Sequence, residues 1–147
     1  MYSKILVPVD GSKTSDRALR EAVALAKATQ GRLTLLHVVD DYPMMIEMSS
    51  AVDFDAVRRH LRMQGEEIVE KAKLRAVTEG VEAETMVTNV TQGRVADAIV
   101  KAAESTRSEL VVMGTHGRRG ISHLVMGSDT EAVVRQCPVP VLVVRSP

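Results

Sequence analysis

The sequence predicts an α/β fold with a five-stranded parallel sheet and helices on both faces of the sheet. Short apolar runs alternate with longer segments of 3.6-residue apolar period, in the order β-α-β-α-β-α-β-α-β. This alternation requires a parallel sheet covered on both faces by its crossover helices. The third run alternates apolar and polar residues, which is typical of an edge strand, whereas the first, second and fourth are almost continuously apolar. With right-handed crossovers, these patterns favour the strand order 3-2-1-4-5.

The chain opens with a strand, a helix and a second strand. Residues 4–9 are apolar almost throughout and predict the first strand. Residues 15–28 place their apolar side chains on one helical face, and Gly31 stands just past them, where a helix-terminating glycine is expected. Residues 33–39 predict the second strand, and residues 40–52 a partly apolar loop rich in methionine.

The rest of the chain continues the alternation. A long helix is followed by Gly80, a glycine that terminates it, and strands and helices then alternate. The expected elements are a helix, an edge strand, a helix, a buried strand, a helix and a final strand over residues 53–78, 81–88, 95–103, 109–113, 128–136 and 139–144.

Composition restricts the class of protein. The chain of 147 residues has the length of a single domain, residues 1–147, and its formal net charge of zero gives no indication of nucleic-acid binding. No apolar run approaches the ~20 residues of a membrane helix, and no signal peptide is visible. The single cysteine, Cys137, permits no internal disulfide. We therefore expect a cytoplasmic protein that binds neither membranes nor nucleic acid.

A glycine-spaced segment is the strongest functional signal. Gly114 and Gly117 follow the fourth predicted strand, and Gly127-Ser128 stands where the last helix begins. Glycines leave backbone N–H groups unshielded, and a helix start adds unpaired donors and a positive dipole end, so this segment is suited to an anion such as a nucleotide phosphate. The Walker and Rossmann phosphate motifs are both absent.

Fold geometry predicts a ligand at the same place. In the order 3-2-1-4-5 the switch point falls between strands one and four, where ligands bind beyond the carboxyl ends of the strands. Strand one ends at Val9-Asp10 and strand four at Met113-Gly114, where the glycine segment begins. With no Trp, one Phe and two Tyr, the chain lacks the aromatic walls that a flavin usually needs, and a base would lie between aliphatic side chains.

Four segments resemble one known family, the universal stress proteins. They are the opening KILVPVDGS of residues 4–12, LLHVV of residues 35–39, VVMGTHG of residues 111–117 and PVPVLVV of residues 138–144. The resemblance runs over essentially the whole chain. Nucleotide-binding members of the family carry G-x2-G-x9-G-[ST], and Gly114, Gly117, Gly127 and Ser128 satisfy that pattern.

The resemblance implies a fold, a ligand and a partner. The implied fold is the adenine nucleotide alpha-hydrolase-like sandwich, the ligand is ATP, ADP or AMP, with or without Mg²⁺, and the partner is a second copy joined through the terminal strand from Val139 to Val144. By the same resemblance, Asp10 accepts from the ribose hydroxyls and Val38 packs on the base. The implied nucleotide-contacting residues are Pro8, Val9, Asp10, Val38, Met113, Gly114, Thr115, His116, Gly117, Arg118, Arg119, Gly120, Gly127, Ser128, Asp129 and Thr130.

Several of these residues also have a purely structural interpretation. Asp10 can cap the turn or the helix that follows it, and Val38 belongs to a strand core with or without a ligand. Ser128 and Glu131 have the spacing of a capping box. His37 lies in mid-strand and is expected to be structural. Asp129 departs from the apolar or small residue often found there in the family, and its carboxylate would repel a phosphate unless it points outward or a divalent cation lies between them.

Three functions therefore remain open. The first is a dimeric regulatory protein of the stress response that senses an adenine nucleotide. The second is a slow ATPase or nucleotide hydrolase, although the sequence offers no convincing general base, no catalytic residue and no metal site, so we expect at most weak ATP hydrolysis. The third is a dimeric scaffold whose glycine segment binds nothing.

Overall fold

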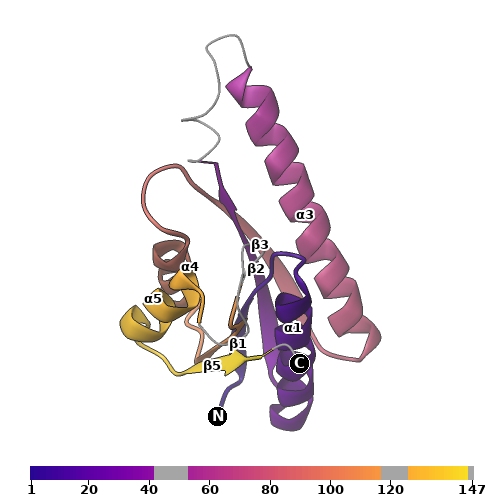
Figure 1. Ribbon diagram of the computed structural model, residues 1–147. Coiled ribbons are helices and arrows are strands. Elements are labelled where there is room, and N and C mark those ends of the chain that lie inside the picture. Colours follow the sequence, from indigo (N-terminus) through magenta and orange to yellow (C-terminus); the bar gives the residue numbers. More distant parts are fainter. Residues whose placement is uncertain (42–52, 117–125, 146–147) are drawn as a thin grey trace.

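The computed structural model describes residues 1–41, 53–116 and 126–145. Within them, strands and helices alternate along the chain (Figure 1). The elements are β1 (Lys4–Pro8), α1 (Lys13–Thr29), β2 (Arg32–Asp40), α3 (Phe54–Thr78), β3 (Ala83–Val90), α4 (Val95–Ser105), β4 (Leu110–Gly114), α5 (Ser128–Gln136) and β5 (Val141–Val144).

The strands form one five-stranded parallel sheet in the order β3-β2-β1-β4-β5, as the sequence predicts. The central strand β1 pairs with β2, for example Ile5 with Leu33, and with β4, where Ile5 stands beside Leu110. The predicted edge position of β3 is confirmed, and most of its residues are at least partly exposed. All carboxyl ends of the strands lie at the same edge of the sheet, and β1 and β4 are neighbours there.

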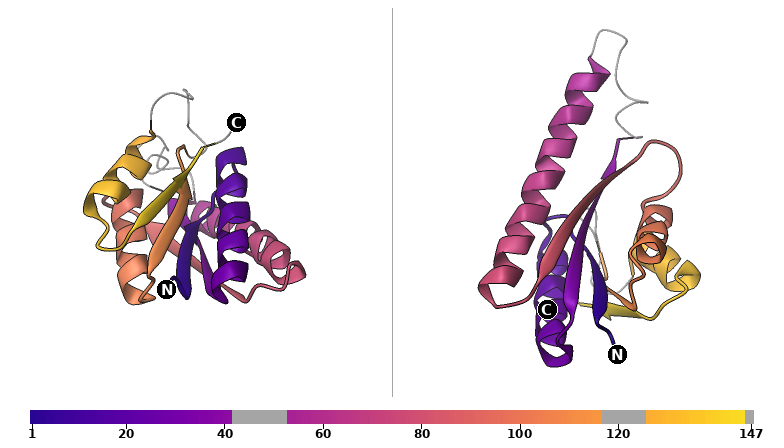
Figure 2. Two further views of the ribbon diagram at one scale, coloured as in Figure 1. Left: turned by 90° about the horizontal axis from the view of Figure 1, so that it is seen from below. Right: turned by 180° about the vertical axis from the view of Figure 1, so that it is seen from behind.

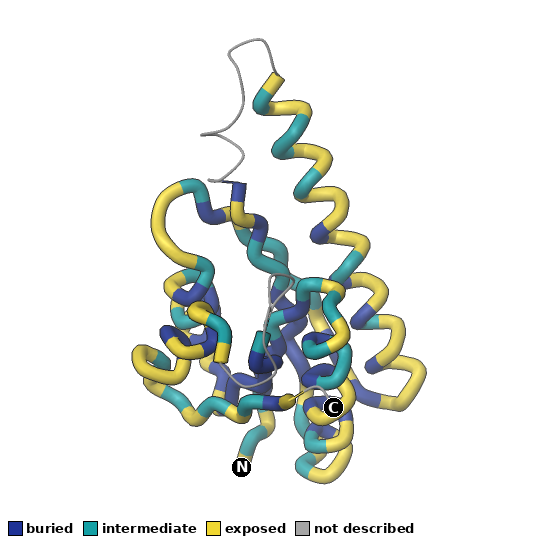
Figure 3. Tube along the Cα trace, viewed as in Figure 1, coloured by how far each residue is buried: buried dark blue, intermediate teal, exposed yellow. Residues whose placement is uncertain are grey.

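Two separate layers of apolar side chains cover the sheet. Helices α1 and α3 pack on one face, while α4 and α5 pack on the other (Figures 1 and 2). On the first face, Val7 and Leu35 meet residues of α1 and α3 such as Leu19 and Val69. On the second, Leu36 and Val111 meet residues of α4 and α5. Buried positions follow the strands and the inner sides of the helices in Figure 3, so the core lies between the sheet and the helices on both of its faces.

The boundaries of α1 differ from those that the apolar period predicts. Ser12 caps the helix, because its side chain accepts a hydrogen bond from the Ser15 backbone N–H, so the helix begins at Lys13. At the other end, Gln30 and not Gly31 adopts the left-handed conformation, with φ of 56°. Gly31 is required for another reason: a Cβ there would lie 2.8 Å from the Tyr2 carbonyl oxygen.

Strands β3 and β5 each begin two residues later than expected. β3 spans Ala83–Val90, where residues 81–88 were predicted, and β5 begins at Val141 and not at residue 139. Pro138 and Pro140 lack a backbone N–H, so neither residue can donate to the sheet. The predicted C-terminal glycine of the long helix is confirmed, since Gly80 follows α3 with φ of 82°.

Helix α3 approaches the sheet closely at one glycine. A Cβ on Gly65 would lie only 2.6 Å from Cδ2 of His37 on β2. The His37 ring is itself held in place, because Nδ1 lies 2.8 Å from the carbonyl oxygen of Val9 at the end of β1. The structural interpretation of His37 is confirmed by this contact.

Over the described ranges, none of the helices has the length and apolar character needed to cross a membrane.

Candidate functional site

The first part of the site is the turn that joins β1 to α1. Asp10 follows β1, and its Oδ1 accepts a hydrogen bond of 2.9 Å from the Ser12 backbone N–H. The Asp10 N–H donates to Oγ of Ser15 over 3.1 Å. These bonds confirm the turn interpretation of Asp10 and hold its partly exposed carboxylate at the carboxyl edge of the sheet. Pro8 is also partly exposed there, whereas Val9 is buried.

The end of β4 packs directly against the start of α1. A Cβ on Gly114 would lie 2.9 Å from Cβ of Thr14 and 3.0 Å from its backbone carbonyl carbon and oxygen. The Thr14 hydroxyl donates to the carbonyl oxygen of His116 over 2.5 Å, which joins the two segments. Gly114 is thus required by close backbone packing, even without a ligand.

Gly127 is the N-cap of helix α5 and lies at the same carboxyl edge of the sheet. Its N–H donates to the carbonyl oxygen of Thr115 over 2.7 Å, and a Cβ would lie 3.2 Å from that oxygen. Gly127 is the N-cap, and Ser128 is the first helical residue. The predicted capping box of Ser128 and Glu131 is therefore wrong, because a residue inside the helix cannot serve as its N-cap.

The first turn of α5 offers some donors to solvent and keeps others for the fold. The first intrahelical bond runs from the Glu131 N–H to the carbonyl oxygen of Gly127, so the preceding N–H groups have no partner within the helix. Ser128 is exposed, and its hydroxyl bonds to none of the described residues. Thr130 is 2% exposed, and its hydroxyl donates 2.9 Å to the carbonyl oxygen of Gly114. The hydroxyl of Thr130, which was predicted to donate to a phosphate, is therefore already bonded to the end of β4. Asp129 is exposed.

Among the other residues of the predicted site, some are partly exposed and others are buried. Val38 on β2 is partly exposed and lies with Met86 at the margin of the core under α4 and α5. Met113 is buried in that core, and the polar residue Thr115 is buried as well. His116 is partly buried: Nδ1 lies 2.9 Å from the Thr115 hydroxyl, and Nε2 has no hydrogen-bond partner among the described residues.

Four predicted site residues, Gly117, Arg118, Arg119 and Gly120, lie outside the described residues. The methionine-rich loop does as well, apart from Asp40, which extends β2, and Asp41.

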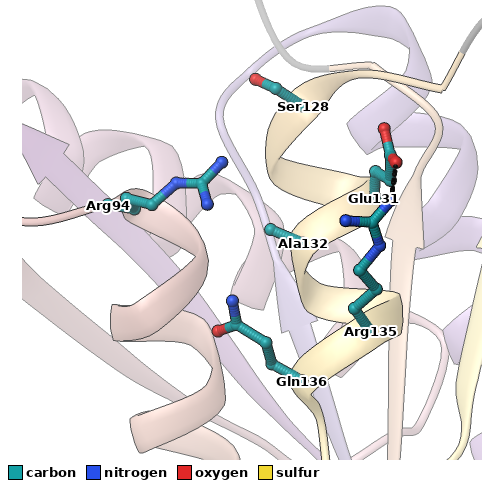
Figure 4. Close-up of a pocket in the computed structure, with 6 residues that line it drawn as sticks. All are labelled: Arg94, Ser128, Glu131, Ala132, Arg135 and Gln136. Carbon is teal, nitrogen blue, oxygen red and sulfur yellow. Dashed lines mark hydrogen bonds and ion pairs between the residues drawn. The ribbon is translucent and has the colours of Figure 1, made fainter.

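Sequence reasoning missed Arg94, which stands at the start of α4. Its backbone N–H donates to Oδ2 of Asp97 over 3.3 Å, which caps the helix. Its side chain extends toward α5 and lines a pocket with Ser128 and Gln136 (Figure 4). One signal was available: the β3–α4 connection ends at the same sheet edge as the glycine segment, so any basic residue in it is a candidate.

No group of three or more His, Cys, Asp or Glu residues in the described ranges could hold a metal ion.

The site can be compared with known proteins. The sequence profile of the universal stress protein family matches residues 1–145. Universal stress protein YxiE of Bacillus subtilis is 34% identical over 99% of this chain and 100% of its own. The solved structure of MJ0577 from Methanocaldococcus jannaschii has a TM-score of 0.87 at 29% identity and covers 100% of this chain and 98% of its own.

A second solved structure contains a bound nucleotide. It is a universal stress protein in complex with cAMP, with a TM-score of 0.69 at 25% identity over 98% of this chain and 97% of its own. The solved structures have the same fold as this chain, and the profile match and the full-length relative show its family. The chain therefore belongs to the universal stress protein family.

Proposed function

We propose that this chain binds an adenine nucleotide at the carboxyl edge of its sheet and acts as a dimeric regulatory protein of the stress response. The observation that carries the proposal is the convergence of three elements there. Asp10 lies in the turn after β1, Gly114 ends β4, and Ser128 begins α5, whose first-turn N–H groups precede the first intrahelical hydrogen bond. The cAMP complex of a family member supports an adenine nucleotide as the ligand class.

Each group suits one part of such a ligand. The N–H groups and hydroxyl at the start of α5 are donors for phosphate oxygens, and the helix dipole adds attraction for the anion. The carboxylate of Asp10 accepts hydrogen bonds from ribose hydroxyls. The partly exposed side chain of Val38 gives the base an apolar surface. Adenine needs no aromatic wall in this arrangement, because aliphatic packing and backbone hydrogen bonds suffice.

Ser128→Glu tests this proposal without weakening the fold. Ser128 is exposed at the first helical position, where a carboxylate stabilises a helix by about 0.3–1 kcal/mol through the dipole. The same carboxylate would repel a phosphate. We expect calorimetry to detect saturable ATP binding by the apo protein and none by Ser128→Glu, whose melting temperature is unchanged or higher. Ser105→Glu is the control, because this exposed residue ends α4 at the opposite edge of the sheet. Equal ATP affinity in all three proteins would refute the proposal.

Asp129 sets the form of nucleotide that is preferred. Its exposed carboxylate lies in the first turn of α5, close to the phosphates of the proposed complex. We propose that the wild type binds ATP better with Mg²⁺ than without it, and that Asp129→Ala reduces this difference. Titrations of ATP, ADP and AMP with and without Mg²⁺ measure it, and identical preferences in the two proteins would reject the role of Asp129.

The regulatory proposal also predicts slow turnover and self-association. ATP incubated with the protein for hours should be recovered intact, whereas rapid release of phosphate would favour an ATPase. The open edge of β5, where Leu142 is 43% exposed, is the surface through which a second copy would pair. Light scattering should give the mass of a dimer for the wild type and of a monomer for Leu142→Lys; a wild-type monomer would contradict this part of the proposal.

A further inference from the structure

A charged pocket between α4 and α5 borders the proposed phosphate site. It has a volume of about 160 Å³ and opens between Arg94 at the start of α4 and Ser128 at the start of α5. Its lining residues are Arg94, Ser128, Glu131, Ala132, Arg135 and Gln136 (Figure 4).

The charges in this pocket do not balance. The guanidinium of Arg135 lies 2.6 Å from Oε1 of Glu131, so these two groups neutralise one another. The guanidinium of Arg94 makes no hydrogen bond or ion pair with any part of the chain that the structure describes. Its side chain nevertheless points across the pocket toward α5 in Figure 4. The pocket is therefore left with one positive charge that an anion can compensate.

The fold does not need the Arg94 side chain. The capping bond to Asp97 comes from the backbone N–H of Arg94, which any residue except proline supplies. The side chain is exposed, and the apolar core under α4 is built by other residues, such as Ala96 and Ile99. A structural role for this guanidinium is thus unsupported by any contact in the described residues.

We propose that Arg94 binds the terminal phosphate of a nucleoside di- or triphosphate and so distinguishes these ligands from a monophosphate. The inference rests on the proposed function, in which the start of α5 donates hydrogen bonds to phosphate oxygens. Arg94 faces Ser128 across the pocket, so a longer polyphosphate tail can extend from the serine toward the guanidinium. A planar guanidinium forms two parallel hydrogen bonds with phosphate oxygens, which a lysine or a water molecule does not reproduce.

The test is a comparison of ATP and AMP binding by Arg94→Gln and the wild type. Calorimetry should show ATP affinity weakened by about tenfold in Arg94→Gln, as expected for one partly exposed charge-assisted contact, and AMP affinity changed by less than about twofold. Arg94→Lys should recover part of the loss. Lys101→Gln, which removes an exposed positive charge elsewhere on α4, is the matched control and should leave both affinities unchanged. Wild-type preference for ATP over AMP should also decrease with added salt.

The other outcomes separate this inference from the proposed function. If the wild type binds AMP and ATP and Arg94→Gln binds both equally well, or loses both equally, the inference is overturned while the nucleotide site stands. If the wild type binds no adenine nucleotide at all, both fail together. Circular dichroism of Arg94→Gln should match the wild type, since the backbone cap of α4 is retained.

Discussion

Replacing Gly65 by alanine should destabilise the protein, although helix propensity alone predicts the opposite. Gly65 is in the interior of α3, where alanine is favoured over glycine by about 0.8–1 kcal/mol. The new Cβ, however, would lie 2.6 Å from Cδ2 of His37, well inside normal contact distance. Either the helix or the imidazole ring must move.

The structure indicates which effect is larger. The ring cannot turn away freely, because its Nδ1 lies 2.8 Å from the carbonyl oxygen of Val9. Overpacking of this kind typically costs about 1–3 kcal/mol, and loss of the hydrogen bond about 1 kcal/mol more. Subtracting the helix-propensity gain leaves an expected loss of about 1–3 kcal/mol in the free energy of unfolding.

Urea denaturation of four proteins tests this reasoning. They are the wild type, Gly65→Ala, His37→Ala and the double variant. Without the His37 ring, the nearest other atom to the new Cβ is Cγ1 of Val87 at 3.4 Å, an ordinary contact. Gly65→Ala should therefore become stabilising by about 0.5–1 kcal/mol in the His37→Ala background. A stabilising effect of Gly65→Ala in the wild type, or the same effect in both backgrounds, would refute the argument.

Substitutions at three further positions test the packing and charges of the described residues. Gly114→Ala should lower the free energy of unfolding by about 1–3 kcal/mol in urea denaturation, because its Cβ would meet the backbone of Thr14 at 3.0 Å and backbone cannot move aside cheaply. Thr130→Val should cost about 1–2 kcal/mol in the same assay, since it leaves the carbonyl oxygen of Gly114 without this donor, and Thr130→Ser should retain most of the stability. Ser3→Ala should raise the pKa of Glu109, which the Ser3 hydroxyl and backbone N–H hold below its ordinary value of 4.5. NMR titration measures that pKa, and in the wild type the stabilisation from this carboxylate should be lost as the pH falls through its lowered pKa.

The apolar pattern was sufficient to predict the order of the strands. The alternating third run became the edge strand β3, and the continuous runs became the interior of the sheet. Burial on both faces favours apolar residues along most of a strand, so the apolar pattern of the sequence indicates which strands lie inside the sheet.

Element ends were predicted less well, because polar residues and backbone geometry determine them. The first turn of α1 contains Lys13 and Thr14, which carry no apolar period, so its start at the Ser12 cap was missed. Gly31 was assigned to the helix end, but its constraint comes from Tyr2, which is distant in sequence. The start of the last strand was placed at residue 139 because residues 139–144 are apolar. Pro140 has no N–H to donate to the sheet, however, and β5 begins after it.

The places of the two glycines in the fold were predicted more accurately than the contacts around them. Glycine spacing and sheet order led to the same edge, where Gly114 and Gly127 are found. Spacing could not show that the Thr130 hydroxyl is occupied by the Gly114 carbonyl, or that Arg94 reaches α5, because both depend on contacts between segments far apart in the chain.

The most direct test of nucleotide binding at this edge is an amide NMR titration of the apo protein with ADP. We expect saturable chemical-shift changes at Asp10, Val38 and Ser128, and none at Gly80 and Arg107, which lie at the opposite edge of the sheet. Unchanged spectra at saturating ADP, or changes confined to the opposite edge, would contradict it.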